Sequence, residues 1–123
     1  MAKDIITIDI YEARRLENKS GTVGKSDAFV ELILGEEKLR TEIQHNARCA
    51  ATWDETFKFR VNGIETVTIS AYDYDRCFRD NLIGQTTLPI TERIDEDQWY
   101  DITTSSGKVT GQIRLAMYFD QDI

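Results

Sequence analysis

Apolar and polar residues alternate along much of the chain. Ile6, Ile8 and Ile10 share one side of their segment, and the segments with this period of two are 5–11, 56–61, 66–73 and 111–119. Strict alternation is the signature of a half-buried strand. Turn-rich stretches separate these segments, and Asn62-Gly63 is a good tight-turn signal. We count seven or eight strands and no long helix, which predicts an all-β sandwich or barrel.

The composition narrows the class of protein further. The chain has 123 residues, the length of one ordinary domain, and a formal net charge of −7. This charge argues against a nucleic-acid partner, because proteins that bind nucleic acids carry basic faces. The N-terminal stretch MAKDIITIDI is interrupted by acidic and polar residues, unlike a secretory signal. We therefore expect a cytoplasmic protein whose two cysteines are reduced thiols.

The residues that catalysis requires are not evident. The chain has one histidine, His45, and lacks both a nucleophile elbow and a glycine-rich phosphate loop. We expect a binding module without catalytic residues, not an enzyme.

The segment AYDYDRCFRDNLIG at 71–84 concentrates negative charge at the end of an apolar strand. In an extended chain Asp73 and Asp75 leave the same side while Tyr74 points away, and Asp80 and Asn81 return toward them. Calcium takes about six to eight oxygen ligands from carboxylates, amides and carbonyls, so this loop could supply several. The residues alone leave two interpretations open: a calcium site, or an acidic turn that only keeps the protein soluble.

The whole chain, read in order, resembles a C2 domain. The matching stretches are IITIDIYEARRL, GKSDAFVEL, KLRTEI, TWDETFKF, TVTISAYDYD and DNLIGQTTLPI. They cover nearly all of residues 1–123, which we interpret as a single C2-like domain. The resemblance implies an eight-stranded antiparallel β-sandwich of the type II arrangement, with three ion- and lipid-binding loops at one end.

The resemblance also implies a set of calcium ligands. The positions that match the family's ligands are Asp27 of the Ser-Asp motif, Asp73, the Tyr74 carbonyl, Asp75, and Asp80 or Asn81 late in the third loop. One departure affects function, because Gly21 stands where the family usually has another first-loop aspartate. Calcium affinity depends on the number of charged ligands, so the sequence predicts weak binding of one ion.

A C2 domain implies calcium-dependent binding to anionic phospholipid membranes, as a peripheral protein in signalling or trafficking. Calcium would neutralise the aspartates and remove their repulsion of acidic lipids. Val23 and Phe78 are candidates for insertion, although Phe78 has the alternative of packing back on the domain. The candidates for phosphate contact are Lys25, Arg76 and Arg79.

Four basic residues form a second candidate site. Lys38, Arg40, Lys58 and Arg60 alternate outward on strands that we expect to be neighbours, which resembles the lysine-rich cluster that binds phosphoinositides in several C2 domains. The alternative is ordinary cross-strand pairing with Glu42 or Glu55.

A rival hypothesis is a calcium-independent protein–protein interaction domain on the same fold, which the missing first-loop aspartate favours. The sequence does not predict the oligomeric state.

Overall fold

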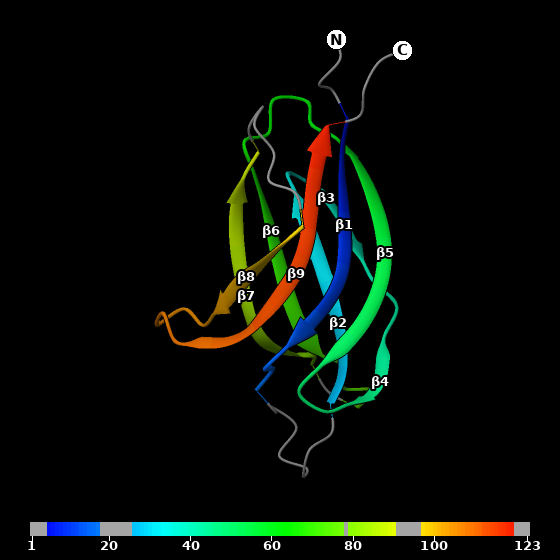
Figure 1. Cartoon of the computed structure of the whole chain (residues 1–123), viewed down its shortest axis with the longest axis vertical. Coiled ribbons are helices and arrows are strands. Elements are labelled where there is room, and N and C mark those ends of the chain that lie inside the picture. Colours follow the sequence, from blue (N-terminus) through cyan, green and yellow to red (C-terminus); the bar gives the residue numbers. More distant parts are fainter. Residues whose placement is uncertain (1–4, 18–25, 78, 91–96, 120–123) are drawn as a thin grey trace.

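The computed structural model of the chain describes residues 5–17, 26–77, 79–90 and 97–119. These residues form nine strands and no helix, so none of them belongs to a helix that could cross a membrane (Figure 1). The strands are β1 (Ile5–Arg14), β2 (Ser26–Leu34), β3 (Glu37–Arg40), β4 (Gln44–Ala47), β5 (Ala51–Arg60), β6 (Thr66–Asp73), β7 (Asn81–Pro89), β8 (Gln98–Thr103) and β9 (Val109–Phe119).

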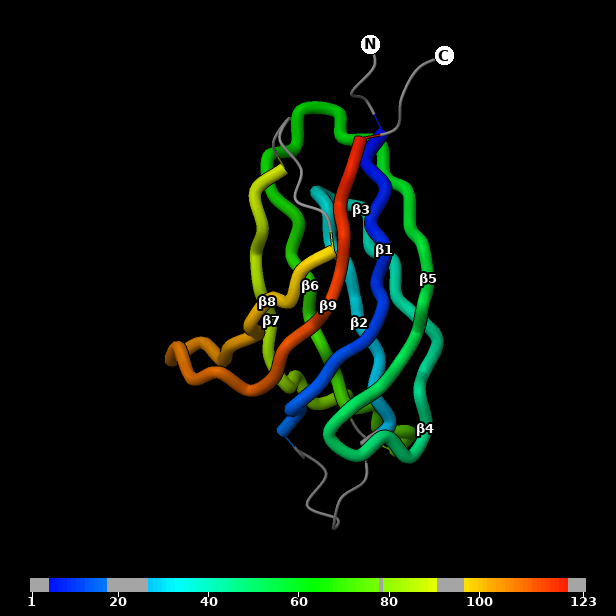
Figure 2. The backbone as a smooth tube through the Cα atoms, in the orientation of Figure 1, coloured from blue at the N-terminus to red at the C-terminus, as the bar shows by residue number. Residues whose placement is uncertain are grey.

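The strands pair in the order β3-β2-β6-β7-β8-β9-β1-β5, and every pairing is antiparallel. β7 and β8 are joined by a single residue pair, Gln85 with Thr103. The order therefore folds at this joint into two layers, β3-β2-β6-β7 and β8-β9-β1-β5 (Figure 2). This confirms the predicted eight-stranded antiparallel sandwich, to which the short β4 is added by pairing with β2.

The core lies between the two layers and includes residues from each of the four alternating segments, together with residues of other strands such as Val30 and Leu32 of β2. Ile6, Ile8 and Ile10 of β1 are fully buried. Buried residues from β6 and β9 join them in one cluster, namely Val67, Ile69, Ala71, Ile113, Leu115 and Met117. Burying such an aliphatic side chain contributes about 1.5–3 kcal/mol, so this shared layer is the main source of stability.

The predicted tight turn is present at Asn62-Gly63. Both residues have left-handed backbones, with φ of 50° and 82°, and the Ile64 N–H donates to the Val61 carbonyl at 2.9 Å. The flanking strands do not form a hairpin, because β5 pairs with β1 whereas β6 pairs with β2 and β7. The turn therefore links the two layers.

One end of the sandwich brings together segments that are distant in sequence. β2 begins there, β6 ends there, and the connections from β4 to β5 and from β6 to β7 lie beside them (Figure 1). Backbone hydrogen bonds join segments at this end, and one of them, from Leu16 N–H to the Cys49 carbonyl at 2.9 Å, ties the residues after β1 to the β4–β5 connection. The predicted calcium ligands belong to this end.

Candidate functional site

Asp73 is the buried centre of the acidic end. It is the last residue of β6, and only 4% of its surface is exposed. Its Oδ1 accepts the Asp27 backbone N–H at 2.9 Å, and the Asp27 carbonyl accepts the Tyr74 N–H at 2.7 Å. Backbone and side-chain hydrogen bonds therefore join the segment of Asp27 to the segment of Asp73 and Tyr74, and both segments carry predicted calcium ligands.

The electrostatic surroundings of Asp73 are unfavourable for a carboxylate. Burial raises the pKa of Asp73, and the negative charges of Asp27, Asp75 and Asp80 raise it further, while the hydrogen bond from the Asp27 N–H acts in the opposite direction. A raised pKa means that the charged form is destabilised by its environment. The charges of three other aspartates at this end therefore act on Asp73.

The loop from Tyr74 to Asp80 is shaped by its own aspartates. Asp75 Oδ1 accepts the Cys77 N–H at 2.9 Å, and Asp80 Oδ1 accepts the Asp75 N–H at 2.9 Å. Asn81 is exposed and starts β7 opposite Asp73. Of the two candidates for the late third-loop position, Asp80 is the one whose charge acts on Asp73.

Two residues at this end, His45 and Asn46, were not predicted to contact Asp27. The Asn46 backbone N–H donates to Asp27 Oδ1 at 2.9 Å, and His45 Nδ1 lies 3.5 Å from the same oxygen. Asn46 has a φ of 58°, a conformation that asparagine tolerates better than most residues. The one signal in the sequence was that residue 46 is an asparagine, a residue type that favours turns. This signal does not indicate that β4 reaches Asp27.

The donor chemistry of this end fits calcium, which prefers carboxylate oxygens. Within the described part of the chain, however, no three His, Cys, Asp or Glu side chains are grouped so as to hold a metal ion. Asp27, Asp73, Asp75 and Asp80 each use Oδ1 to accept a backbone N–H. The structure therefore gathers the carboxylates without forming a closed coordination shell.

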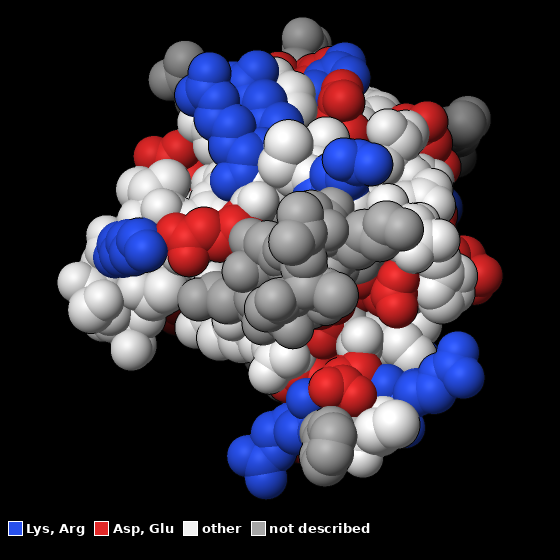
Figure 3. All heavy atoms as spheres, turned by 90° about the horizontal axis from the view of Figure 1, so that it is seen from below, with Lys and Arg blue, Asp and Glu red and all other residues white. Residues whose placement is uncertain are grey.

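Basic side chains surround the acidic ones. Figure 3 looks at this end of the molecule and shows acidic surface in several places, bordered by basic groups. The arginines Arg15, Arg48, Arg76 and Arg79 are exposed in its connecting segments. Three predicted membrane contacts lie outside the described residues, namely Val23, Lys25 and Phe78.

Two residues of the predicted basic patch, Lys38 and Arg40, lie on β3, and the other two, Lys58 and Arg60, lie on β5. Lys38 Nζ lies 3.9 Å from Glu31 of β2, and the Arg40 guanidinium lies 5.0 Å from the Phe29 ring centroid, also on β2. Lys58 Nζ lies 3.2 Å from Thr7 Oγ1 on β1.

Arg60 of β5 is paired with Ile5 of β1. The expectation that the two strands carrying these residues are neighbours is wrong, because β3 pairs with β2 and β5 pairs with β1. Glu55 instead accepts the Glu42 backbone N–H, at 2.8 Å.

Comparison with known proteins agrees with this architecture. The C2 domain family matches residues 4–102, which is most of the chain. The chain belongs to the C2 domain family. This C2 domain is 30% identical to a probable serine/threonine-protein kinase of Dictyostelium discoideum, over 99% of the chain but 13% of the kinase. It is 22% identical to elicitor-responsive protein 1 of Oryza sativa subsp. japonica, over 94% of the chain and 83% of that protein.

Solved structures share the fold of this C2 domain. The C2A domain of plant extended synaptotagmin 1 has a TM-score of 0.83 and 19% identity, with 100% of this chain and 98% of that chain covered. A calcium-bound structure of the C2A and C2B domains of extended synaptotagmin 2 has a TM-score of 0.80 and 21% identity, over 97% of this chain and 46% of that one. At these identities the likeness establishes the fold, and the calcium belongs to the other protein.

Proposed function

We propose that residues 1–123 act as one C2 domain that binds anionic phospholipid membranes in a calcium-dependent manner, without enzymatic activity. The protein would be cytoplasmic and join membranes as a peripheral protein in signalling or trafficking. The observation that carries the proposal is the buried Asp73, whose pKa is raised by burial and by the charges of Asp27, Asp75 and Asp80. A divalent cation is the ligand that such a group of carboxylates fits.

The residues that would hold calcium are those predicted from the sequence. The carboxylates are Asp27, Asp73, Asp75 and Asp80, with the Tyr74 carbonyl and the Asn81 amide oxygen as further donors. When bound, the ion would offset the negative charge that separates this end from an acidic lipid surface. With Gly21 in place of a first-loop aspartate, we expect one ion and a dissociation constant weaker than about 10 μM.

The membrane contacts would come from the same end. Exposed Arg76 and Arg79 lie in the loop that carries Asp75 and Asp80, and guanidinium groups bind phosphate well. Lys25, Val23 and Phe78 remain the other proposed contacts. Lys38 and Arg40 on β3 are proposed as a separate phosphoinositide contact, with about 1 kcal/mol for each basic residue near an acidic membrane.

Calorimetry tests the calcium step. Calcium is titrated into the chelator-stripped chain, into Asp73→Asn/Asp75→Asn, and into Glu36→Gln/Glu37→Gln. This turn variant also loses two negative charges, at Glu36 of the β2–β3 turn and at Glu37, the first residue of β3, and both residues are exposed. We expect saturable heat from the wild type and the turn variant, and none from the aspartate variant.

The second candidate function is calcium-independent binding to a protein. It is favoured by the lack of a three-residue metal group among the described side chains. Absence of heat from the wild type at millimolar calcium would reject the calcium step and leave this function.

A further inference from the structure

The outer face of the β8-β9-β1-β5 layer carries a second polar and aromatic site. Because Ile8 and Ile10 of β1 point into the core, Asp9 points to the opposite side. Tyr11 follows at an irregularity of β1, and its hydroxyl reaches Asp9 on the same side. Asp9 stands opposite Thr56 of β5 and Ala116 of β9 in the strand register. This face is formed by the middle of the strands, away from the loops that carry the calcium candidates.

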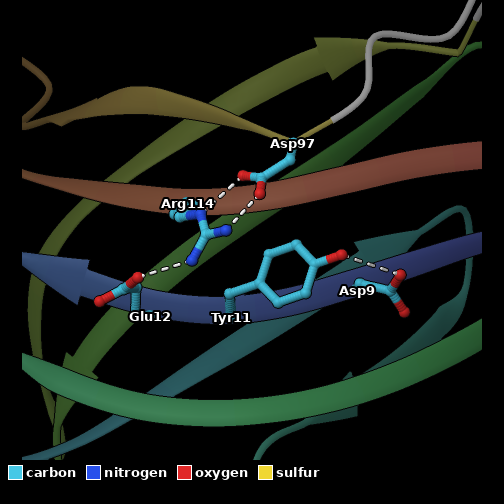
Figure 4. A network of polar contacts seen from close by, with 5 residues as sticks. All are labelled: Asp9, Tyr11, Glu12, Asp97 and Arg114. Carbon is cyan, nitrogen blue, oxygen red and sulfur yellow. Dashed lines mark hydrogen bonds and ion pairs between the residues drawn. The ribbon is translucent and has the colours of Figure 1, made fainter.

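Arg114 of β9 organises one side of this face (Figure 4). Its Nε donates to Asp97 at 2.7 Å, its Nη2 makes a second contact with the same carboxylate, and its Nη1 donates to Glu12 at 2.8 Å. The guanidinium also lies 4.8 Å from the Tyr11 ring centroid. These hydrogen bonds, first those to Asp97 and then the one to Glu12, raise the pKa of Arg114. The charge of Arg114 is therefore already matched by two carboxylates.

Asp9 on the other side of the Tyr11 ring has a different set of partners. Its Oδ1 accepts the Thr56 hydroxyl at 2.7 Å, and its Oδ2 accepts the hydroxyls of Tyr118 at 3.2 Å and Tyr11 at 3.4 Å. All three are neutral. Among the described side chains no cation pairs with Asp9, and Lys58 in the next row contacts Thr7 at 3.2 Å. A carboxylate charge thus remains between two phenol rings.

We infer that the Asp9 carboxylate, with the rings of Tyr11 and Tyr118, binds a lysine or arginine side chain from a basic segment of a protein partner. A cation at this position would gain a charge partner and the face of the Tyr118 ring, while the Tyr11 ring is already contacted by Arg114. Tyr118 is 44% exposed, so an incoming side chain can reach the site. The inference does not depend on calcium binding.

Two further observations describe the surroundings of this site. Burial raises the pKa of Tyr11, and the charges of Asp9 and Asp97 raise it as well. Nearby, the Arg14 guanidinium lies 3.8 Å from the Trp99 ring centroid and its Nε donates to Gln112. Tyr, Trp and Arg are the residues that dominate binding energy in protein interfaces, and here hydrogen bonds already order Tyr11 and Arg14.

The test uses nitrogen-15-labelled chain in chelator and the blocked peptide acetyl-Ala-Arg-Ala-Arg-Ala-amide, followed by NMR. We expect chemical-shift changes centred on Asp9, Tyr11, Thr56 and Tyr118. Binding should weaken about three- to tenfold in Asp9→Asn and in Tyr118→Ala, because each removes one part of the site. Glu37→Gln, which loses the same charge from β3, should leave the affinity unchanged.

Thermal unfolding of each variant separates loss of binding from loss of fold. Tyr118→Ala is the second variant because its side chain is partly exposed and tolerates truncation better than a core residue. The inference is overturned if shifts are absent, if they centre on the loop end, or if Glu37→Gln weakens binding as much as Asp9→Asn. It is also overturned if phosphatidylcholine vesicles, and not the peptide, bind in an Asp9-dependent way, since the ligand would then be a lipid headgroup.

Discussion

At the scale of single residues, Asp73 combines burial with like charge. Its surroundings disfavour its ionised form, whereas the hydrogen bond from Asp27 N–H favours it. A residue with a purely structural role at this position would accept the same hydrogen bond as an asparagine, without the charge. The carboxylate therefore lowers the stability of the cation-free fold, and a ligand that binds the folded state would recover that stability.

Removing this charge should stabilise the protein in chelator. Because the folded state holds the Asp73 proton more tightly than the unfolded chain, ionised Asp73 destabilises the fold at neutral pH, and this cost fades as the pH falls through the raised pKa. We expect Asp73→Asn to raise the melting temperature by a few degrees at neutral pH. The difference from wild type should shrink on acidification, as followed by circular dichroism.

Asp97 provides a control of opposite sign for that experiment. The hydrogen bonds from Arg114 lower the pKa of Asp97, so its contribution is present at neutral pH and is lost as the pH falls through the lowered pKa. Asp97→Asn should therefore lower the melting temperature slightly at neutral pH. A destabilised Asp73→Asn protein would contradict the electrostatic account of the site.

At the scale of elements, the joint between β7 and β8 depends on a glycine. A Cβ on Gly84 would overlap Thr110 Oγ1 and lie 3.2 Å from the Thr103 backbone nitrogen. The Thr110 hydroxyl is buried and donates to the Ile83 carbonyl at 2.7 Å. Gly84 thus lets β7 approach β8 and β9 where the two layers meet through one residue pair.

Substitution of this glycine should be costly. We expect Gly84→Ala to lower the free energy of unfolding by about 1–3 kcal/mol, because the methyl group overpacks the joint. Adding Thr110→Ala to Gly84→Ala should give coupling between the two sites in a double-mutant cycle. Urea denaturation measures both.

Gly63→Ala serves as the matched control, since no atom lies within 4 Å of a Cβ there and only the positive φ opposes it. Its cost should be about 1 kcal/mol. Simple additivity of Gly84→Ala and Thr110→Ala would mean that their contact does not limit the joint.

At the scale of the whole molecule, the charge is distributed unevenly. The chain has a net charge of −7, yet the acidic end, with its four aspartates Asp27, Asp73, Asp75 and Asp80, also carries the four exposed arginines Arg15, Arg48, Arg76 and Arg79. This arrangement suits a surface that is repelled from acidic lipids until its aspartates are neutralised and then presents guanidinium groups to phosphates.

Vesicle sedimentation should reveal this behaviour. We expect binding to phosphatidylserine-containing vesicles to rise at least several-fold on adding calcium, and to weaken with salt, because the contacts are between opposite charges. Phosphatidylcholine vesicles serve as the control. Equal binding to acidic vesicles in chelator and in calcium would argue for a constitutive membrane domain.

The strands and the core followed from the sequence because alternation is a local property. Ile6, Ile8 and Ile10 are buried as predicted, and Asn62-Gly63 turns as predicted. The acidic segment at the end of β6 was also predicted from the sequence, because Asp73 and Asp75 mark the end of an apolar strand. These features depend on neighbours a few residues away, which the sequence displays directly.

The strand order and the meeting of distant side chains were decided by the tertiary structure. Lys38 and Arg40 lie on a strand that pairs with β2, whereas Lys58 and Arg60 lie on a strand that pairs with β1, and periodicity does not encode pairing. Asn46 reaches Asp27, and Asp9 meets Thr56, across connections of the chain whose geometry depends on the packing of both layers. The sequence by itself determined which residues face inward. Only the packed sandwich determined which outward residues meet, because those contacts form between strands that are remote along the chain.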